Sequence, residues 1–254
     1  MKKSFFEYDK PLLTTMVQAD NPDRIKELID KSVPEGAEAF GMQFEQMNPE
    51  YRTKEVYNDL FAYAKDKPIY VTNYRSSKNE GKSDKQLADE LLELADCGAD
   101  LCDVMGDCFD RQPDELAVDK TAIEKQKELI KKIHDKGAKV LMSSHLLKYI
   151  PAERVLEIAL EHQKRGADIC KIVTGADTME QQIENLKIIN MLKENLKIPF
   201  LFLCGGECGI LRRIGGEIGC CMYLCVQEYD ELATPAQPLL KDVKIIRNTM
   251  TYKS

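Results

Sequence analysis

The chain has 254 residues, of which 43% are hydrophobic and 31% are charged, and its formal net charge at pH 7 is -7. This is the composition of an ordinary globular protein, and no basic stripe is available to neutralise the phosphates of a nucleic acid. No apolar run has the length of a signal sequence or a membrane span, so we expect a cytoplasmic protein without a membrane partner. The length suits one α/β barrel or two small domains.

Eight short apolar segments follow one another at regular intervals and are bounded by glycine, proline or aspartate. Short, continuous apolar runs with such boundaries are typical of buried parallel strands. The predicted strands cover residues 11–18, 37–44, 68–75, 100–107, 138–144, 168–174, 199–204 and 221–226.

Between these strands, apolar residues recur three and four positions apart, as they do on the buried face of a helix. Clear examples of predicted helices cover residues 23–32, 84–95, 121–136, 152–165, 179–194 and about 238–250. Repeated strand–helix units in a chain of this length predict a (β/α)8 TIM barrel, with residues 1–254 as a single domain. A doubly wound open sheet is the alternative, but no G-x-G-x-x-G motif follows the first strand.

The chain contains nine cysteines, and no two of them form a C-x-x-C pair. In a reducing compartment such cysteines are typically small buried hydrophobes, and this is the reading we expect. Cys204, Cys208, Cys221 and Cys225 come nearest to ligand spacing, so a metal site or a nucleophilic thiol in this region is an alternative. We expect no metal and no cofactor.

Lys171 lies within RGADICKIVT (165–174), which otherwise reads as a buried strand. An ammonium group among apolar side chains is costly to keep charged, so a neutral amine becomes available. A neutral amine attacks a ketone to form an imine, which then withdraws electrons from the next carbon. The alternatives are a lysine that reaches the solvent from the strand end and a lysine held in an ion pair.

Histidine is the other group suited to this chemistry, because it exchanges protons near neutral pH. His145 follows the apolar run of the fifth predicted strand, where it serves either as a general acid/base or as a satisfied rim histidine. His134 and His162 occur in polar helical stretches, and we expect both at the surface.

In a TIM barrel the reactive side chains gather at the carboxyl ends of the strands. The residues that this rule adds to Lys171 and His145 are Arg75, Asp103, Met105, Asp107, Arg213 and Gln237. Inward-facing arginines suit a ligand that carries a carboxylate or several hydroxyl groups.

Five segments resemble the type I 3-dehydroquinate dehydratases, which are Schiff-base enzymes of the shikimate pathway of aromatic amino acid biosynthesis. The segments are VTNYRSSKNEGK (71–82), VLMSSH (140–145), ADICKI (167–172), GILRRIGGEIG (209–219) and ATPAQPLL (233–240). The resemblance implies a TIM barrel, a homodimer and a lyase that forms an imine at Lys171, with His145 as general acid/base. It also implies that Arg75, Arg213 and Gln237 bind a small carboxylated cyclic ketone.

The sequence departs from this family at four places. Gly41-Met42-Gln43 replaces an E-x-R pair at the end of strand two, and Met105 replaces a strand-four glutamate. Ala233 replaces a serine of the last loop, and the N-terminal hairpin is shortened to about ten residues. The lost charges change what the pocket can hydrogen-bond, so Gln43 and Met105 are expected to shape its specificity. A carboxylate is still needed beside His145, and we expect Asp107, or else Asp103, to supply it.

These features leave three functions open. The first is dehydration of a carboxylated cyclic ketone such as 3-dehydroquinate. The second is a related imine-forming reaction of the aldolase or isomerase type on another keto acid. The third is a non-catalytic barrel that binds a carboxylated ligand.

Overall fold

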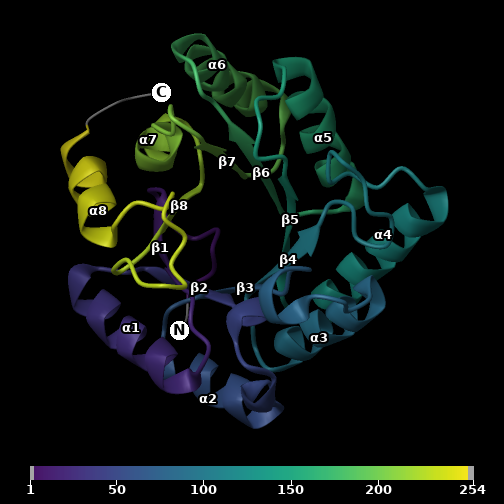
Figure 1. Ribbon diagram of the computed structural model, residues 1–254, viewed down its shortest axis with the longest axis vertical. Coiled ribbons are helices and arrows are strands. Elements are labelled where there is room, and N and C mark those ends of the chain that lie inside the picture. Colours follow the sequence, from purple (N-terminus) through teal and green to yellow (C-terminus); the bar gives the residue numbers. More distant parts are fainter. Residues whose placement is uncertain (1–2, 251–254) are drawn as a thin grey trace.

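The computed structural model describes residues 3–250, which form the predicted TIM barrel. Eight strands surround the central axis and eight α-helices lie outside them (Figure 1). The strands are β1 (Leu12–Val17), β2 (Ala39–Gln43), β3 (Ile69–Thr72), β4 (Leu101–Met105), β5 (Lys139–His145), β6 (Ile169–Gly175), β7 (Phe200–Gly205) and β8 (Met222–Cys225). The helices are α1 (Pro22–Glu35), α2 (Lys54–Tyr63), α3 (Asp84–Asp96), α4 (Lys120–Asp135), α5 (Ala152–Arg165), α6 (Met179–Asn195), α7 (Leu211–Ile218) and α8 (Leu240–Thr249).

All paired strands are parallel, in the order β7-β6-β5-β4-β3-β2-β1-β8. The barrel is nearly closed, because β7 and β8 form the two edges of this sheet and no ladder joins them within residues 3–250. Beside this seam the backbone N–H of Cys221 donates to the carbonyl of Phe200 at 2.9 Å. The arrangement excludes the doubly wound alternative.

Alternate residues of each strand face the barrel interior and the surrounding helices, as the period of two requires. On β1, for example, Leu12 and Met16 pack in one buried cluster and Leu13 and Val17 in the other. The strands read as continuous apolar runs because both of their faces are covered.

The helices begin and end at residues that satisfy their free backbone groups. Asn21, Ser83 and Thr178 accept hydrogen bonds at the N-termini of α1, α3 and α6, and Ser83 forms a capping box with Gln86. Gly166 ends α5 with a φ of 102°, a conformation that glycine adopts without strain.

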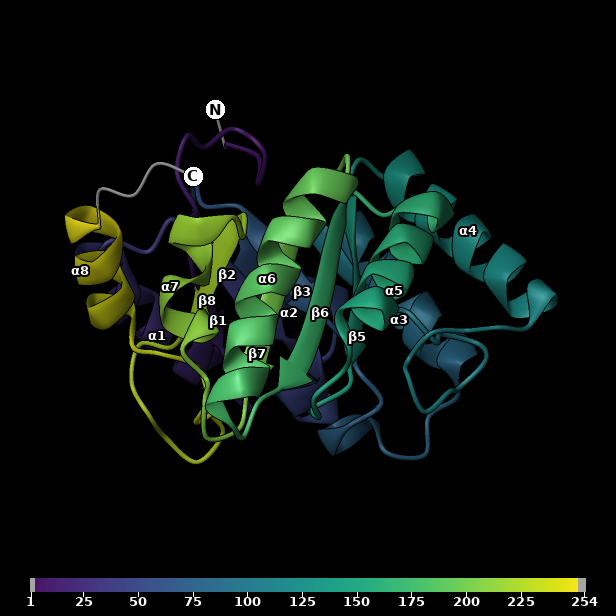
Figure 2. The ribbon, with the colours of Figure 1, turned by 90° about the horizontal axis from the view of Figure 1, so that it is seen from above.

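The two ends of the barrel differ. The strand tips and the long connecting loops lie at one end, and the N-terminal segment lies at the other (Figure 2). Residues 3–11 form turns and no strand, and Phe5 among them is buried against the barrel core. Within residues 3–250, no helix is both long enough and apolar enough to span a membrane.

Candidate active site

A cavity of about 820 Å³ opens at the carboxyl ends of the strands. The predicted site residues that line it are Gln43, Arg75, Met105, Asp107, His145, Lys171 and Gln237. Side chains from six of the eight strands, or from the loops that follow them, therefore meet in one place. This is expected because the carboxyl ends of all barrel strands lie at the same end of the barrel.

Lys171 occupies the third position of β6, and its side chain is only 5% exposed. Its ammonium nitrogen donates to the hydroxyls of Tyr74 at 2.8 Å and Tyr70 at 3.0 Å, and to Oδ2 of Asp103 at 3.3 Å. The expectation of an amine surrounded by apolar side chains alone is wrong, because the barrel interior supplies a carboxylate and two phenols.

Tyr70 lies on β3, and Tyr74 lies two residues beyond the end of that strand. Both hydroxyls donate to Oδ2 of Asp103, while the hydroxyl of Ser143 donates to Oδ1 at 2.5 Å. Burial, followed by the negative charge of Asp103, raises the pKa of both tyrosines well above its ordinary value. Their hydroxyls therefore stay protonated at neutral pH.

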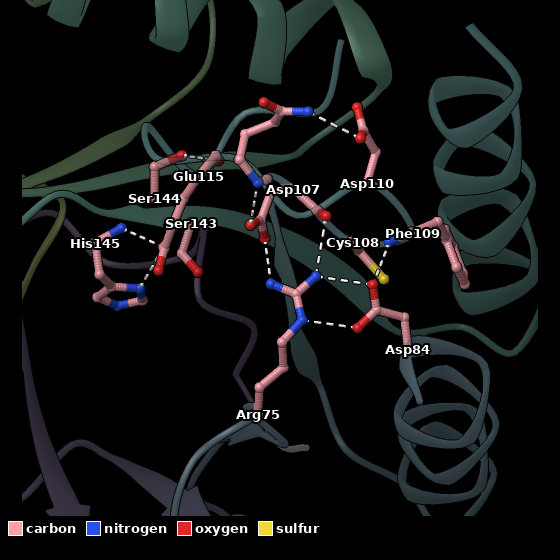
Figure 3. Close-up of polar contacts among 12 residues, drawn as sticks. Arg75, Asp84, Asp107, Cys108, Phe109, Asp110, Glu115, Ser143, Ser144 and His145 are labelled. Atoms are coloured by element: carbon pink, nitrogen blue, oxygen red, sulfur yellow. Dashed lines mark hydrogen bonds and ion pairs between the residues drawn. The ribbon is translucent and has the colours of Figure 1, made fainter. Parts of the chain in front are cut away.

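His145 ends β5 and contacts Glu115, which comes from the loop between β4 and α4 (Figure 3). Oε2 of Glu115 accepts the backbone N–H of His145 at 2.5 Å and lies 3.3 Å from Nδ1 of its ring. The prediction that Asp107 or Asp103 would pair with this histidine is wrong, since both aspartates bind other cations. Burial alone would raise the pKa of Glu115, but the hydrogen bonds and charge of His145 lower it.

Glu115 is held in place by groups behind the cavity. Its carbonyl accepts the hydroxyl of Ser144 at 2.7 Å, and that hydroxyl lies 3.1 Å from Nε2 of His162. His162 was expected at the surface but is completely buried, and burial lowers its pKa to about 3. Gly106 lies against the same three groups and has no room for a side chain.

Arg75 lies at the cavity but its guanidinium is occupied. It forms a two-pronged ion pair with Asp84 at 2.7 and 2.8 Å, and its Nη1 donates to Asp107 at 2.6 Å (Figure 3). Burial opposes its charge, but the two carboxylates raise the pKa of Arg75. Two negative charges around one positive charge leave little attraction for an anionic ligand.

The arginine that lines the cavity after β7 is Arg212 rather than Arg213. Arg213 is exposed on α7, whereas Arg212 is buried and anchored by its Nε to the carbonyl of Cys204 at 3.1 Å. No carboxylate pairs with Arg212 in the part of the chain that the structure describes, and burial lowers its pKa. The prediction of Arg213 at the barrel mouth is therefore corrected by one residue.

Gln237 lies in the loop after β8, is 5% exposed, and its side-chain oxygen has no hydrogen-bond partner in residues 3–250. Gln43 instead binds Gln18 at 2.5 Å, and Gln18 in turn binds Thr234 at 2.6 Å. This chain of polar side chains connects β2 to the loop that carries Gln237.

The family model of the type I 3-dehydroquinases matches residues 14–253. This chain belongs to that family. A 3-dehydroquinate dehydratase of Clostridium novyi is 28% identical over 210 residues, which cover 82% of this chain and 78% of that protein. A second relative of that name, from Alkaliphilus oremlandii, is 38% identical over 106 residues, or 41% of this chain and 40% of that protein.

Solved structures agree on the fold. The type I 3-dehydroquinate dehydratase of Clostridium difficile has a TM-score of 0.77 at 19% identity, covering 95% of this chain and 92% of that one. The enzyme of Geobacillus kaustophilus has a TM-score of 0.79 at 17% identity, covering 94% and 91%. Membership in the type I 3-dehydroquinase family makes this protein a carbon–oxygen lyase of the dehydratase type, as predicted.

One departure from the type I 3-dehydroquinase pattern has a local structural reason. A Cβ on Gly41 would lie 2.3 Å from Sδ of Met16 and 3.0 Å from the ring of Tyr70. A charged side chain at this position would therefore require Met16 to turn away. It would also press against the ring of Tyr70, whose hydroxyl binds Lys171.

The nine cysteines are all unpaired, and six of them are buried. Burial raises the pKa of the Cys102, Cys170 and Cys221 thiols, among others, which disfavours the thiolate form. In residues 3–250, no group of three or more histidine, cysteine or acidic side chains has the geometry of a metal site. These observations agree with the reading of the cysteines as small packing residues.

Proposed function

We propose that this protein dehydrates 3-dehydroquinate through an imine formed at Lys171. The observation that carries the proposal is the placement of Lys171 and the Glu115-bound His145 on one cavity of a barrel in the type I 3-dehydroquinase family. An amine that can bond to a ketone and a histidine that can move protons are the two groups that the reaction needs.

His145 is suited to proton transfer because of the way its ring is held. A hydrogen bond from Nδ1 to Glu115 fixes the proton on that nitrogen and leaves Nε2 without a partner in residues 3–250. Nε2 removes the proton from the carbon beside the imine, and the resulting imidazolium then protonates the departing β-hydroxyl. Glu115 stabilises the imidazolium while it carries the charge.

Arg212 and Gln237 are the proposed carboxylate-binding pair. Both side chains are buried at the cavity, and neither has a carboxylate partner among the described residues. A guanidinium without a counter-ion in a sheltered site binds an anion more strongly than one that is already paired, such as Arg75.

A related carboxylated ketone is the second candidate substrate. The observation that favours it is the pair of uncharged cavity residues Gln43 and Met105, together with the occupied guanidinium of Arg75. A pocket that has lost charged groups binds a different pattern of hydroxyls. Such a substrate would use the same imine chemistry.

The experiment is incubation with 3-dehydroquinate, with absorbance of the conjugated product as the readout. Borohydride added during turnover is expected to fix the substrate to the peptide that contains Lys171, as detected by mass spectrometry. Lys171→Met is expected to abolish both signals, whereas Lys85→Met, at an 81%-exposed lysine, is the matched control. Trapping without product favours the related substrate, and ligand-induced thermal stabilisation without trapping favours a non-catalytic binding barrel.

The resemblance also supports a cytoplasmic homodimer, which we propose for this chain. Light scattering on the purified protein is expected to give twice the chain mass of 28.9 kDa. A monomer at micromolar concentration would contradict the dimer but leaves the chemistry of the cavity unaffected.

A further inference from the structure

We infer that Asp103 is a catalytic base that takes the proton from the Lys171 ammonium before the amine attacks the carbonyl. The inference rests on the proposed imine at Lys171 and assigns a role that His145 does not fill. It follows from a hydrogen-bonded set of four side chains, of which Tyr70, Asp103 and Lys171 are buried and Tyr74 is half-buried at the cavity.

The ammonium of Lys171 has no free N–H. Its three hydrogen-bond acceptors are the two phenol oxygens and Oδ2 of Asp103, at 2.8 to 3.3 Å. A charged ammonium has no lone pair, so one of these protons must leave before a bond to carbon can form. Asp103 is the carboxylate in contact with the nitrogen, and its side chain is fully buried.

The proton transfer is balanced within the pair. The N–H bond breaks with its electrons left on nitrogen, and an O–H bond forms at Oδ2 of Asp103. The neutral amine then adds to the ketone carbon, and a proton passes from nitrogen to the former carbonyl oxygen. Asp103 returns its proton to this hydroxyl, water leaves, and the positively charged imine remains beside the restored carboxylate.

Tyr70 and Tyr74 position the two reacting groups. Their pKa is raised by burial and by Asp103, so each hydroxyl donates to Oδ2 and still accepts a hydrogen bond from Lys171. They hold the nitrogen in place after its proton has gone. The ring of Tyr74 also packs edge-on against the ring of His145, with centroids 5.0 Å apart. Tyr74 therefore contacts both proton-transfer groups, Asp103 and His145.

The competing view is that Asp103 is only a counter-ion. A carboxylate in that role keeps the amine charged, so its removal would leave imine formation unchanged or faster. A base in the reaction has the opposite signature, because its removal slows the step by a factor of about 10² to 10⁴. The direction of one rate change therefore separates the two roles.

The test uses formaldehyde and cyanoborohydride, which methylate a lysine through an imine without any need for the natural substrate. Mass spectrometry gives the methylation rate of Lys171 at pH 7 in the full-length protein. Asp103→Asn is expected to lower this rate by about 10²-fold or more. Asp103→Glu is expected to restore much of it, since the carboxylate returns while the packing changes.

Asp168→Asn is the matched control for loss of an aspartate. Asp168 lies just before β6, at the end of the strand opposite the cavity mouth, and pairs with His134 and Lys139. Tyr57→Phe is the control for loss of a buried hydroxyl, against Tyr74→Phe at the site. Both controls are expected to leave the methylation of Lys171 unchanged, whereas Tyr74→Phe is expected to slow it.

Methylation of exposed Lys85, read in the same spectra, shows whether the reagents act equally on the natural chain and on each Asp103 variant. A methylation rate of Lys171 that is equal or faster in Asp103→Asn would overturn the inference.

These outcomes are separate from those of the proposed function. Borohydride trapping with 3-dehydroquinate tests whether the substrate forms an imine, and formaldehyde tests how Lys171 loses its proton. If trapping fails and the formaldehyde result holds, only the proposed function is contradicted. If trapping succeeds and the formaldehyde result fails, only the role of Asp103 is contradicted.

Discussion

The carboxylate that contacts His145 is supplied by Glu115, eight residues beyond Asp107, the partner that the sequence predicted. Its backbone has a φ of 43°, which is uncommon for a residue with a side chain. The loop keeps this conformation because Ser144 and the backbone of Gln112 hold it. This uncommon backbone conformation orients the Glu115 carboxylate toward the imidazole of His145.

Glu115→Gln keeps the shape of the side chain but removes its charge. We expect kcat for 3-dehydroquinate to fall by about 10²-fold with little change in KM, because the imidazolium loses its stabilising partner. Steady-state kinetics measure both constants. Asp114→Asn is the control, since Asp114 belongs to the same loop but pairs with Arg154 outside the cavity; an equal loss in both variants would contradict the role of Glu115.

The sequence placed Lys171, His145 and Gln237 at the strand ends where the cavity opens, but it did not single out Glu115, Tyr70 or Tyr74. The period of two places Tyr70 on the face of β3 that turns inward, so a signal for it was present. Glu115 had no such signal, because a loop has no period. Arg212 and Arg213 are neighbours near the start of a helix, about 100° apart around its axis, and the sequence did not reveal which one faces inward.

At the scale of elements, seven of the eight strands begin and end within two residues of their predicted bounds, and the named helices are present. Strand three is the exception, since it ends at Thr72 while Arg75 lies in the loop beyond it. Buried parallel strands are readable because both faces are apolar. Helices α2 and α7 were not singled out, and α7 is short and contains Gly215 and Gly216.

The loop between β4 and α4 depends on Gly106. A Cβ there would lie 2.5 Å from the carbonyl of Glu115 and 2.8 Å from both Ser144 and His162. We expect Gly106→Ala to reduce the free energy of unfolding by about 1–3 kcal/mol and to reduce kcat, because the loop must move. Urea unfolding and steady-state kinetics measure the two effects.

Gly205→Ala is the matched control for this substitution. The nearest atom to a Cβ at Gly205 is the carbonyl oxygen of Thr174 at 3.9 Å, which is an ordinary contact. We expect this variant to unfold within about 0.5 kcal/mol of the natural chain. A Gly106→Ala protein with unchanged stability and kcat would show that the loop has room to adjust.

For the whole molecule, two buried groups give stability opposite pH dependences. Burial lowers the pKa of His162 to about 3, so the unfolded chain binds the extra proton and stability falls as pH drops below about 6.5. Burial raises the pKa of Glu45 to about 7, so the folded chain binds the extra proton and stability falls as pH rises from about 4.5 to 7. Between pH 4.5 and 6.5 the two pH dependences of the free energy of unfolding have opposite signs and cancel.

Single substitutions are expected to expose these opposing effects. Relative to the natural chain, His162→Gln removes a slope of up to about 1.4 kcal/mol per pH unit, and Glu45→Gln removes one of opposite sign. Urea unfolding at pH 5, 5.5, 6 and 6.5 measures the difference curves. Parallel curves for all three proteins would mean that neither group keeps its shifted proton affinity in the folded state.

The seam between β7 and β8 divides the two halves of the proposed carboxylate grip. Arg212 follows the strand on one side and Gln237 follows the strand on the other, so an anion held by both would tie the two sheet edges together across the barrel wall. Ligand binding is then expected to slow amide deuterium exchange in residues 200–205 and 222–225 more than in the fully paired strands opposite. Substrate binding would in this way complete the barrel at the edge where no strand ladder closes it.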